Sequence, residues 1–388
     1  MKRPIIGVLT WREGKRFAEP AYFRRLLRAG QELGSTVFLF SPKDVLAGGK
    51  QVRGFVLDAN GRWQARIFDR PDAVFDRFRY TPTQAFKEYV AFRRTSNFLY
   101  ANNRLANKWR VHEVLERDER MHRWLPETLL YNRANLVKML GRHSFLYVKP
   151  LNGTGGRNIL SIERSEQGYR LLGRDRKRAK ISTIIKQPAA LQRFVDRWTR
   201  AEKFIVQQGL RLQLVPKRAV DMRLLIQKDG NGDWCVTGHG MRVGGERSAT
   251  SNLHGGGKAM PVPEFLRPRF GEARTAEIVR DCEQLAYQTA ETLENHFGRM
   301  VEFGLDIGID VNGRPWLIEV NPKPAREVFR EMGALKQYRQ AISRPLEYAM
   351  YLARTRGQEE KERKYARISE AQREHAKAGS KASQLRGN

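Results

Sequence analysis

Residues 316–324 read WLIEVNPKP, an apolar run that ends in a carboxylate and an amide before two prolines. Alternate side chains of an extended strand point to the same face, so Glu319 and Asn321 are expected to converge on one object. The prolines end the strand because each lacks a backbone N–H donor. Carboxylate and amide oxygens suit a hard cation, so the segment suggests a metal site.

The composition predicts an ordinary globular protein of two or three domains. The chain has 388 residues, of which 40% are hydrophobic, so it can bury a sizeable core. No apolar run reaches the roughly 18 residues of a membrane helix, and the N-terminal run is too short for a signal peptide. Cys235 and Cys282 lie far apart without histidine at ligand spacing, which argues against a disulfide framework or a zinc site. We therefore expect a soluble, cytoplasmic protein with no membrane span.

The chain is strongly basic, with a formal net charge of +30 and a densest basic segment, RDRKRAK, at residues 174–180. Such a charge favours an acidic partner: a small molecule, a peptide, a polymer or an anionic surface. Nucleic acid is compatible with the charge, but the segment matches no nucleic-acid-binding motif. A solvated basic face that keeps the protein soluble explains the charge equally well.

The N-terminal part of the chain has the pattern of a small parallel α/β domain. A strand at 5–9, a helix at 19–33 and a strand at 36–40 form a β-α-β unit. Short apolar runs at 54–57 and 73–75 extend this unit. Residues 83–115 are expected to be helical.

The later part of the chain is expected to form a second region, with a different order of strands, loops and helices. It contains a strand, a glycine loop and a strand within residues 144–164, followed by a charged hairpin. Further elements are expected as helices at 189–199 and 272–296 and strands at 204–207, 221–227, 234–241, 301–309 and 315–320. The composition predicts a basic, flexible tail over residues 351–388.

The glycine loop, NGTGGRN at residues 152–158, follows Lys149 directly along an expected strand. Closely spaced glycines let several backbone N–H groups point at one anion. The loop lacks residues that the P-loop and protein-kinase patterns need, and it fails the dinucleotide-binding pattern because the residues after it alternate like a strand rather than a helix. A plain β-turn explains the loop alone, whereas a hairpin that closes over a nucleotide triphosphate would use both the loop and the lysine.

The order of the remaining motifs resembles the ATP-grasp superfamily, and over residues 1–350 it looks most like the spore-coat-associated YheC/YheD branch. The motifs are NKWRVHEVL with Lys108, the glycine loop with Lys149, FIVQQGL at 204–210, DMR at 221–223, GMRVGG at 240–245, TSNLHGGG at 250–257, FGLDIGID at 303–310 and WLIEVNPKP. Asp306, Glu319 and Asn321 match the metal-binding pattern D…E-x-N of that superfamily.

The resemblance implies an α+β fold of the ATP-grasp type, in which a small N-terminal parallel α/β domain precedes two α+β subdomains that clasp ATP. The implied segments are the N-terminal domain at 1–100, the subdomain with the glycine-rich loop at 101–205, the subdomain with the metal site at 206–350 and the tail at 351–388. It also implies that Asp306, Glu319 and Asn321 hold two Mg²⁺ ions, or Mn²⁺ in their place.

The resemblance also assigns roles at the nucleotide and acceptor sites. Lys108 and Lys149 would contact phosphates. The residues expected to close over the triphosphate are Gly153, Thr154, Gly155, Gly156 and Arg157. The residues expected to line the adenine pocket are Gln207, Gln208, Gly209 and Leu210. Arg242 would stabilise the transferred phosphoryl group and Arg223 would bind phosphate or substrate carboxylate, because guanidinium groups suit the oxygens of both. Asn252 would line the acceptor side.

The implied function is ATP- and Mg²⁺-dependent ligation of a carboxylate to an amine through an acyl-phosphate, on an acidic acceptor linked to the spore coat. One departure is the lack of an acidic residue for the ribose between Gln207 and Asp221. Another is Lys323, which adds positive charge beside the expected acceptor site. The alternatives are a non-catalytic scaffold that binds nucleotide or polyanion and a phosphotransferase that stops at a phosphorylated product.

Overall fold

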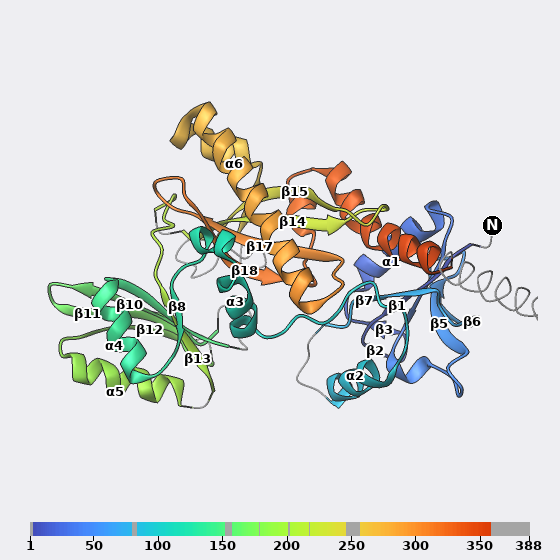
Figure 1. Ribbon diagram of the computed structural model, residues 1–388, viewed down its shortest axis with the longest axis horizontal. Coiled ribbons are helices and arrows are strands. Elements are labelled where there is room, and N and C mark those ends of the chain that lie inside the picture. The colour runs from blue at the N-terminus through green and yellow to red at the C-terminus, as the bar shows by residue number, and fades with distance from the viewer. Residues whose placement is uncertain are drawn as a thin grey trace, which may run out of the picture. The chain divides into compact units, whose positions relative to one another are not determined.

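The computed structural model describes residues 3–79, 84–151, 157–177, 179–200, 202–216, 218–245 and 257–357 (Figure 1). It divides into two compact units. The first contains the described residues of Met1–Ala101, Asp229–Asp233 and Ile342–Asn388, and the second those of Asn102–Lys228 and Trp234–Ala341. Within the described ranges, no helix has the length and apolarity needed to cross a bilayer.

The first unit is built on a five-stranded sheet with the order β6-β5-β4-β1-β7. Its strands are β1 (Ile5–Leu9), β4 (Thr36–Phe40), β5 (Gln51–Leu57), β6 (Trp63–Asp69) and β7 (Ala73–Asp76), with a small ribbon of β2 (Arg12–Glu13) and β3 (Arg16–Phe17). The strands β4, β1 and β7 are parallel, as the sequence predicts, and α1 (Pro20–Glu32) is the expected helix of the β-α-β unit.

The other two strands depart from the parallel arrangement, because β5 runs antiparallel to both β4 and β6. A tight turn joins β5 to β6. The carboxylate of Asp58 accepts hydrogen bonds from the backbone N–H groups of Asn60 and Arg62, and Gly61 adopts a φ of +72°. A glycine tolerates this left-handed conformation, so the turn reverses the chain without strain.

The expected continuous helix over residues 83–115 is instead two helices, α2 (Gln84–Thr95) and α3 (Lys108–Glu116). Asn107 begins α3 as its N-cap, since its side chain accepts a hydrogen bond from the backbone N–H of Arg110 at 3.0 Å. An asparagine at this position stabilises a helix start and competes with helix continuation.

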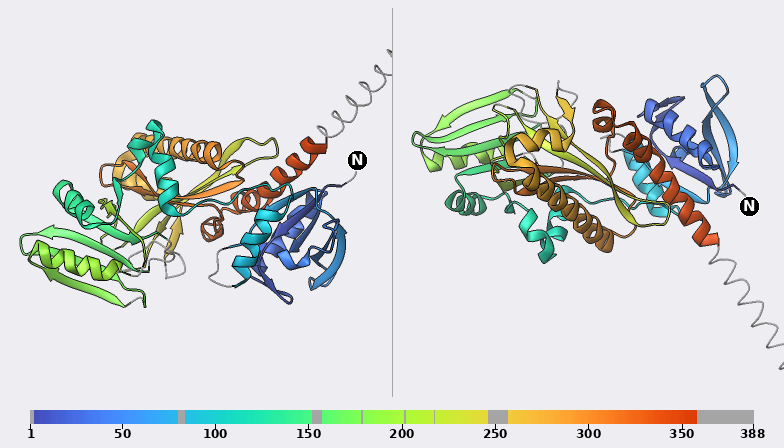
Figure 2. Two further views of the ribbon diagram at one scale, coloured as in Figure 1. Left: turned by 60° about the horizontal axis from the view of Figure 1, so that its bottom comes forward. Right: turned by 90° about the horizontal axis from the view of Figure 1, so that it is seen from above.

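The second unit contains a six-stranded sheet with the order β12-β11-β10-β9-β13-β8. Its strands are β8 (Thr128–Leu130), β9 (Phe145–Pro150), β10 (Ile159–Ser165), β11 (Gly168–Arg174), β12 (Lys180–Ile185) and β13 (Phe204–Gln208). Buried residues of α4 (Arg133–Arg142) and α5 (Pro188–Thr199) pack with Leu146, Val148 and Leu171 in one core (Figure 2). The two helices therefore cover one face of the sheet, and the other face carries Tyr147 and Lys149.

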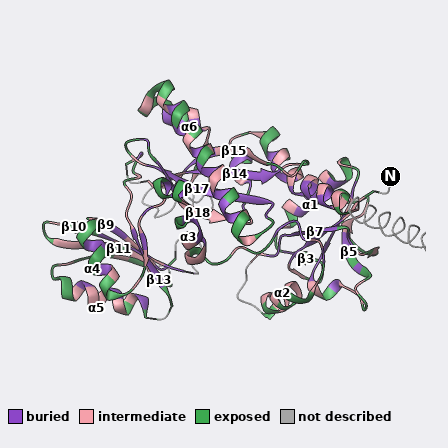
Figure 3. Cartoon of the chain, in the orientation of Figure 1, coloured by how far each residue is buried: buried purple, intermediate pink, exposed green. Residues whose placement is uncertain are grey.

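A five-stranded antiparallel sheet with the order β16-β15-β14-β17-β18 completes the second unit. Its strands are β14 (Val220–Lys228), β15 (Trp234–Val243), β16 (Lys258–Met260), β17 (Glu302–Ile309) and β18 (Pro315–Asn321). The second unit also contains the 3₁₀ helix η2 (Glu119–Trp124) and α7 (Glu327–Glu331), and a last helix covers residues 335–357, of which those from Ile342 on belong to the first unit. The central strands are almost fully buried (Figure 3).

The helix α6 (Val262–Phe297) covers the apolar face of this sheet. It contains the expected helix at 272–296 and begins ten residues earlier, with Gly271 as a non-helical residue at φ +73°. Side chains of Met222, Leu305 and Leu317 point into the core beside α6. Alternation along the strands then places the polar side chains of the sheet on the opposite face.

Candidate active site

The centre of the candidate site is the pair of strands that carry the D…E-x-N pattern. Asp306 on β17 pairs with Glu319 on β18, whereas the next residue, Ile307, pairs with Leu317. Ile318 is therefore an additional residue, which makes a β-bulge. Without it Glu319 would point into the apolar core, because shifting a strand register by one residue exchanges its two faces.

The bulge brings the three predicted metal ligands together on one face. Glu319 lies opposite Asp306, and the Asn321 Nδ2 lies 3.5 Å from the Asp306 Oδ2. This confirms that Glu319 and Asn321 share a face of the strand.

Two arginines hold Asp306, one from the neighbouring strand β14 and one from the next strand, β15. The Arg223 Nε donates to Asp306 Oδ1 at 2.7 Å, and Arg242 Nη2 lies 3.1 Å from the same oxygen. Arg242 also donates two hydrogen bonds to the carboxylate of Asp221, from Nε to Oδ1 at 2.7 Å and from Nη2 to Oδ2 at 2.6 Å. Although burial alone would lower the pKa of Arg242, the carboxylates of Asp306 and Asp221 raise that pKa above its ordinary value. Both guanidinium groups therefore lie against the same carboxylate oxygen of Asp306.

The two predicted phosphate-binding lysines lie near the same carboxylates. Lys108 is the first residue of α3, and its Nζ lies 3.3 Å from Glu319 Oε1. Lys149 on β9 donates to Gln207 Oε1 at 2.7 Å. The pKa of Lys149 falls to about 8, because burial lowers it and the charge of Lys108 adds to this effect, while Glu319 opposes both. The two ammonium groups are thus close enough to repel each other.

The residues expected at the adenine pocket lie at the end of β13. Gln207 is buried, and its Nε2 donates to the Thr128 hydroxyl at 2.9 Å, so its side chain holds Lys149 in place. The Gln208 Oε1 accepts from the backbone N–H of Glu127 at 3.2 Å. Gln208, Gly209 and Leu210 line a cavity of about 440 Å³. Gly209 contacts the ring of Phe145 so closely that a Cβ would clash with it.

Several predicted residues lie outside the described residues: Gly153, Thr154, Gly155, Gly156 and Asn252. Arg157 is described and exposed, and no contact joins it to the carboxylates or lysines of the site. The structure therefore brings together the lysines, arginines and carboxylates, but it does not bring Arg157 to them.

The donor set fits Mg²⁺ in its chemistry. Asp306 and Glu319 supply carboxylate oxygens and Asn321 an amide oxygen, which are the hard ligands that Mg²⁺ prefers alongside water and phosphate. Among the described residues, no three His, Cys, Asp or Glu side chains gather in a way that could hold a metal. A metal here would therefore depend on the amide and on ligands outside the protein.

The sequence model of the YheC/D-like ATP-grasp family matches residues 97–352. The chain belongs to this family. It is 25% identical over 364 residues to the endospore coat-associated protein YheD of Bacillus subtilis (strain 168), covering 90% of this chain and 79% of YheD. It is 23% identical over 346 residues to YheC of the same organism, covering 86% of this chain and 93% of YheC.

The same fold occurs in solved structures of ATP-grasp proteins. The structure of the D-cycloserine synthetase DcsG superposes with a TM-score of 0.51 at 14% identity, covering 87% of this chain and 98% of DcsG. The expected α+β architecture of the ATP-grasp type is confirmed, as is the resemblance to the YheC/YheD family.

Sequence reasoning missed three residues in this YheC/D-like site. Asp221 is the bidentate partner of Arg242. The triplets DMR at 221–223 and GMR at 240–242 could have indicated this contact, because they lie opposite each other on paired strands. Ile318 and Leu212 both lie within contact distance of the place where a Cβ on Gly308 would stand. They add apolar side chains to the polar face of the sheet, and only the bulge reveals Ile318 there.

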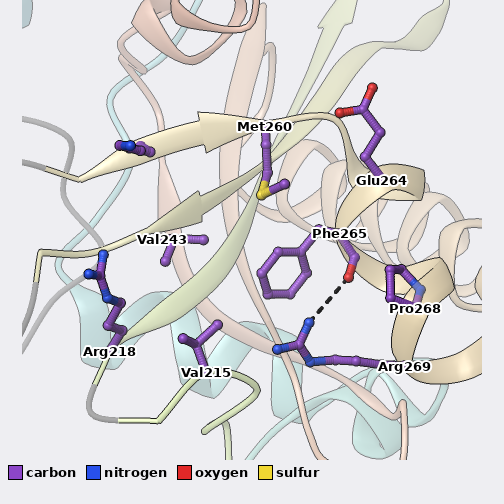
Figure 4. Close-up of a pocket in the computed structure, with 9 residues that line it drawn as sticks. Val215, Arg218, Val243, Met260, Glu264, Phe265, Pro268 and Arg269 are labelled. Atoms are coloured by element: carbon purple, nitrogen blue, oxygen red, sulfur yellow. Dashed lines mark hydrogen bonds between the residues drawn. The ribbon is translucent and has the colours of Figure 1, made fainter.

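A second cavity, of about 350 Å³, lies between β15, β16 and the start of α6 (Figure 4). Val243 and Phe265 line it with apolar side chains, and Arg269 donates to the backbone oxygen of Phe265. Val243 follows Arg242 along β15, so the two side chains point to opposite faces of the sheet. This cavity is therefore separate from the carboxylates and lysines of the candidate active site.

Proposed function

We propose that this protein is an ATP- and Mg²⁺-dependent carboxylate–amine ligase that acts on an acidic acceptor through an acyl-phosphate. The observation that carries the proposal is the pairing of Asp306 with Glu319 beside Asn321, with two lysines close by. Membership of the YheC/D-like ATP-grasp family supports the same reading.

The lysines are proposed to bind the phosphates of ATP. Lys108 is half-exposed and paired weakly with Glu319, so it can exchange that contact for a phosphate oxygen. Lys149 is oriented by Gln207, which limits its freedom before ATP arrives. Bound Mg²⁺, held by Asp306, Glu319 and Asn321, would neutralise phosphate charge. Adenine is proposed to bind near Gln208, Gly209 and Leu210.

Arg242 is proposed to stabilise the charge on the transferred phosphoryl group. Its Nε and Nη2 contact Asp221 and Asp306, whereas its Nη1 makes no hydrogen bond with any residue that the structure describes. A guanidinium has five N–H donors, so donors remain for phosphate oxygens. Arg223 is proposed to hold Asp306 and to bind substrate carboxylate, and Asn252 to line the acceptor side.

The experiment is release of ADP and phosphate from Mg²⁺-ATP by the purified protein with a panel of acidic acceptors and amines. The control is Glu319→Ala. Turnover that requires both acceptor and amine and is lost in the variant supports the ligase. Transfer of labelled γ-phosphate to a stable product without amine consumption would instead identify a phosphotransferase.

A scaffold that binds nucleotide or polyanion without turnover is the second candidate. Its support is the net charge of +30 together with the amides, rather than carboxylates, at Gln207 and Gln208. Tight ATP binding without turnover would favour it. The similarity to YheD and YheC, which are named endospore coat-associated proteins, supports a proposed association with the spore coat, and cytoplasmic synthesis is likewise a proposal.

A further inference from the structure

We propose that the edge strand β12 and the sheet face beside it form a docking site for an extended acidic polypeptide, which adds to the sheet as a further strand. The proposal rests on the proposed ligase function and deepens it, since it names an acidic polypeptide as the substrate class. It also gives a role to the basic segment at residues 174–180, which the active site does not use.

The first observation is a free edge. In the sheet order β12-β11-β10-β9-β13-β8, β12 is the outer strand, and among the described residues it pairs with β11 alone. Four of its six residues are exposed. An outer strand presents one row of backbone N–H and C=O groups, and an extended peptide can pair with that row through main-chain hydrogen bonds.

The second observation is a row of cations on the face that carries Lys149. Ser161 pairs with Tyr147 and with Leu172, and Leu172 pairs with Ser182, so these residues form one row across four strands. Lys149, Arg174 and Lys180 each lie two positions from a member of that row and therefore share its face. Arg174 and Lys180 form a direct cross-strand pair.

These outer cations are available to a ligand. Neither Arg174 nor Lys180 forms an ion pair with any described residue, and as neighbours they repel each other. Strands are spaced by roughly 4.8 Å, so Lys180 lies roughly 14 Å from the strand of Lys149. The basic row thus leads from the edge of the sheet toward the proposed phosphate site.

The third observation selects a polypeptide over other polyanions. Leu172 and Ile184 are 47% and 44% exposed, and both lie on the face of the basic row. Exposed aliphatic side chains beside a free strand edge suit a peptide with alternating side chains. Nucleic acid and polyphosphate cannot pair with a strand edge. A second copy of this chain is disfavoured, because β12 and its neighbours would bring together like charges.

The register makes the proposal specific. Lys180 and Ile184 are four residues apart and point to the same face of β12. A peptide strand along this edge would place an acidic side chain beside Lys180 and an apolar side chain beside Ile184, with the same spacing. The binding motif is therefore an acidic residue and an apolar residue with three residues between them.

The test is fluorescence anisotropy, without ATP, of a labelled peptide in which Glu and Val lie four positions apart with Thr between them, bound to the full chain. Lys180→Glu and Ile184→Asp are each expected to weaken binding roughly tenfold, since one reverses a charge contact and the other removes an apolar contact. Lys138→Glu is the matched control, because Lys138 is exposed on α4, which covers the opposite face. This variant should bind like the wild type.

A peptide of the same sequence with N-methyl groups at alternate residues tests the strand pairing, because it keeps the charge and loses donors. Weaker binding of this peptide supports the proposal, and equal binding overturns it. The proposal is also overturned if Lys138→Glu weakens binding as much as Lys180→Glu. It is overturned too if polyphosphate displaces the peptide from Ile184→Asp as well as it displaces it from the wild type. Peptide binding without ADP release would support the docking site and contradict the ligase. Acceptor-dependent turnover, with peptide binding unchanged in Lys180→Glu, would support the ligase and contradict the docking site.

Discussion

The Nζ of Lys108 lies 3.3 Å from Oε1 of Glu319, which joins the start of α3 to the end of β18. Both side chains are partly exposed, so the pair contributes at most about 1 kcal/mol to stability. A pair this weak keeps opposite charges adjacent, and either residue can give up the ion pair for a contact with a ligand. In the proposed function, Lys108 would turn to a phosphate oxygen and Glu319 would be released for a metal.

Lys149 predicts a pH dependence of ATP binding. Burial lowers its pKa to about 8, so its positive charge is present below pH 8 and is lost as the pH rises above it. A phosphate beside the ammonium raises that pKa again, so ATP binding should take up protons near pH 8.5 and weaken by up to about tenfold per pH unit above 8. Calorimetry in buffers with different ionisation enthalpies measures this uptake.

The control for proton uptake is Lys149→Arg, because a guanidinium stays protonated throughout this range. The variant should bind ATP without proton uptake at Lys149. Unchanged uptake in Lys149→Arg would assign the proton to another group and would contradict the role given to Lys149.

The two arginines predict an order of stability losses. Arg242→Gln leaves Asp221 without its bidentate partner and weakens the contacts of Asp306, and it should lower the free energy of unfolding by about 3 kcal/mol. Arg223→Gln should cost about 1 kcal/mol less, because Asp306 keeps Arg242. Chemical denaturation measures both. An equal loss, or the reverse order, would show that Asp221 does not depend on Arg242.

Gly304 predicts a steric requirement beside the site. A Cβ there would lie 2.5 Å from the Cβ of Pro324 and 3.1 Å from Nη1 of Arg223. Gly304→Ala should therefore destabilise the protein by about 1–3 kcal/mol, as overpacking usually does. Gly141→Ala is the matched control, because nothing lies near its Cβ in α4, and alanine there should stabilise by about 0.5–1 kcal/mol. Thermal unfolding of both variants checks the contrast, and a stable Gly304→Ala would contradict it.

The parts of the fold that sequence analysis identified are those with a strong local pattern. Alternation in residues 301–309 and 315–320 predicts β17 and β18, and the same alternation places Glu319 with Asn321. The antiparallel direction of β5 has no such signal, because an apolar run is compatible with either direction. The turn at Asp58 and Gly61 then sets the direction of β6 relative to β5.

The site depends on long-range features that the sequence does not display. The bulge at Ile318 turns Glu319 toward Asp306, and a bulge leaves little trace in a pattern of apolar residues. The binding of Gln207 to both Lys149 and Thr128 likewise depends on three strands meeting in one register. Motif order located these residues, and tertiary pairing determined their partners.

The most direct test of the proposed site is calorimetric ATP binding, with and without Mg²⁺, to the wild type, Glu319→Gln and Glu32→Gln. Glu32 is an exposed residue of α1 and serves as the matched control. We predict Mg²⁺-dependent binding in the wild type and in Glu32→Gln, weakened at least about tenfold in Glu319→Gln because one carboxylate ligand is lost. Binding that is equal with and without Mg²⁺, or unchanged in Glu319→Gln, would contradict the metal site formed by Asp306, Glu319 and Asn321.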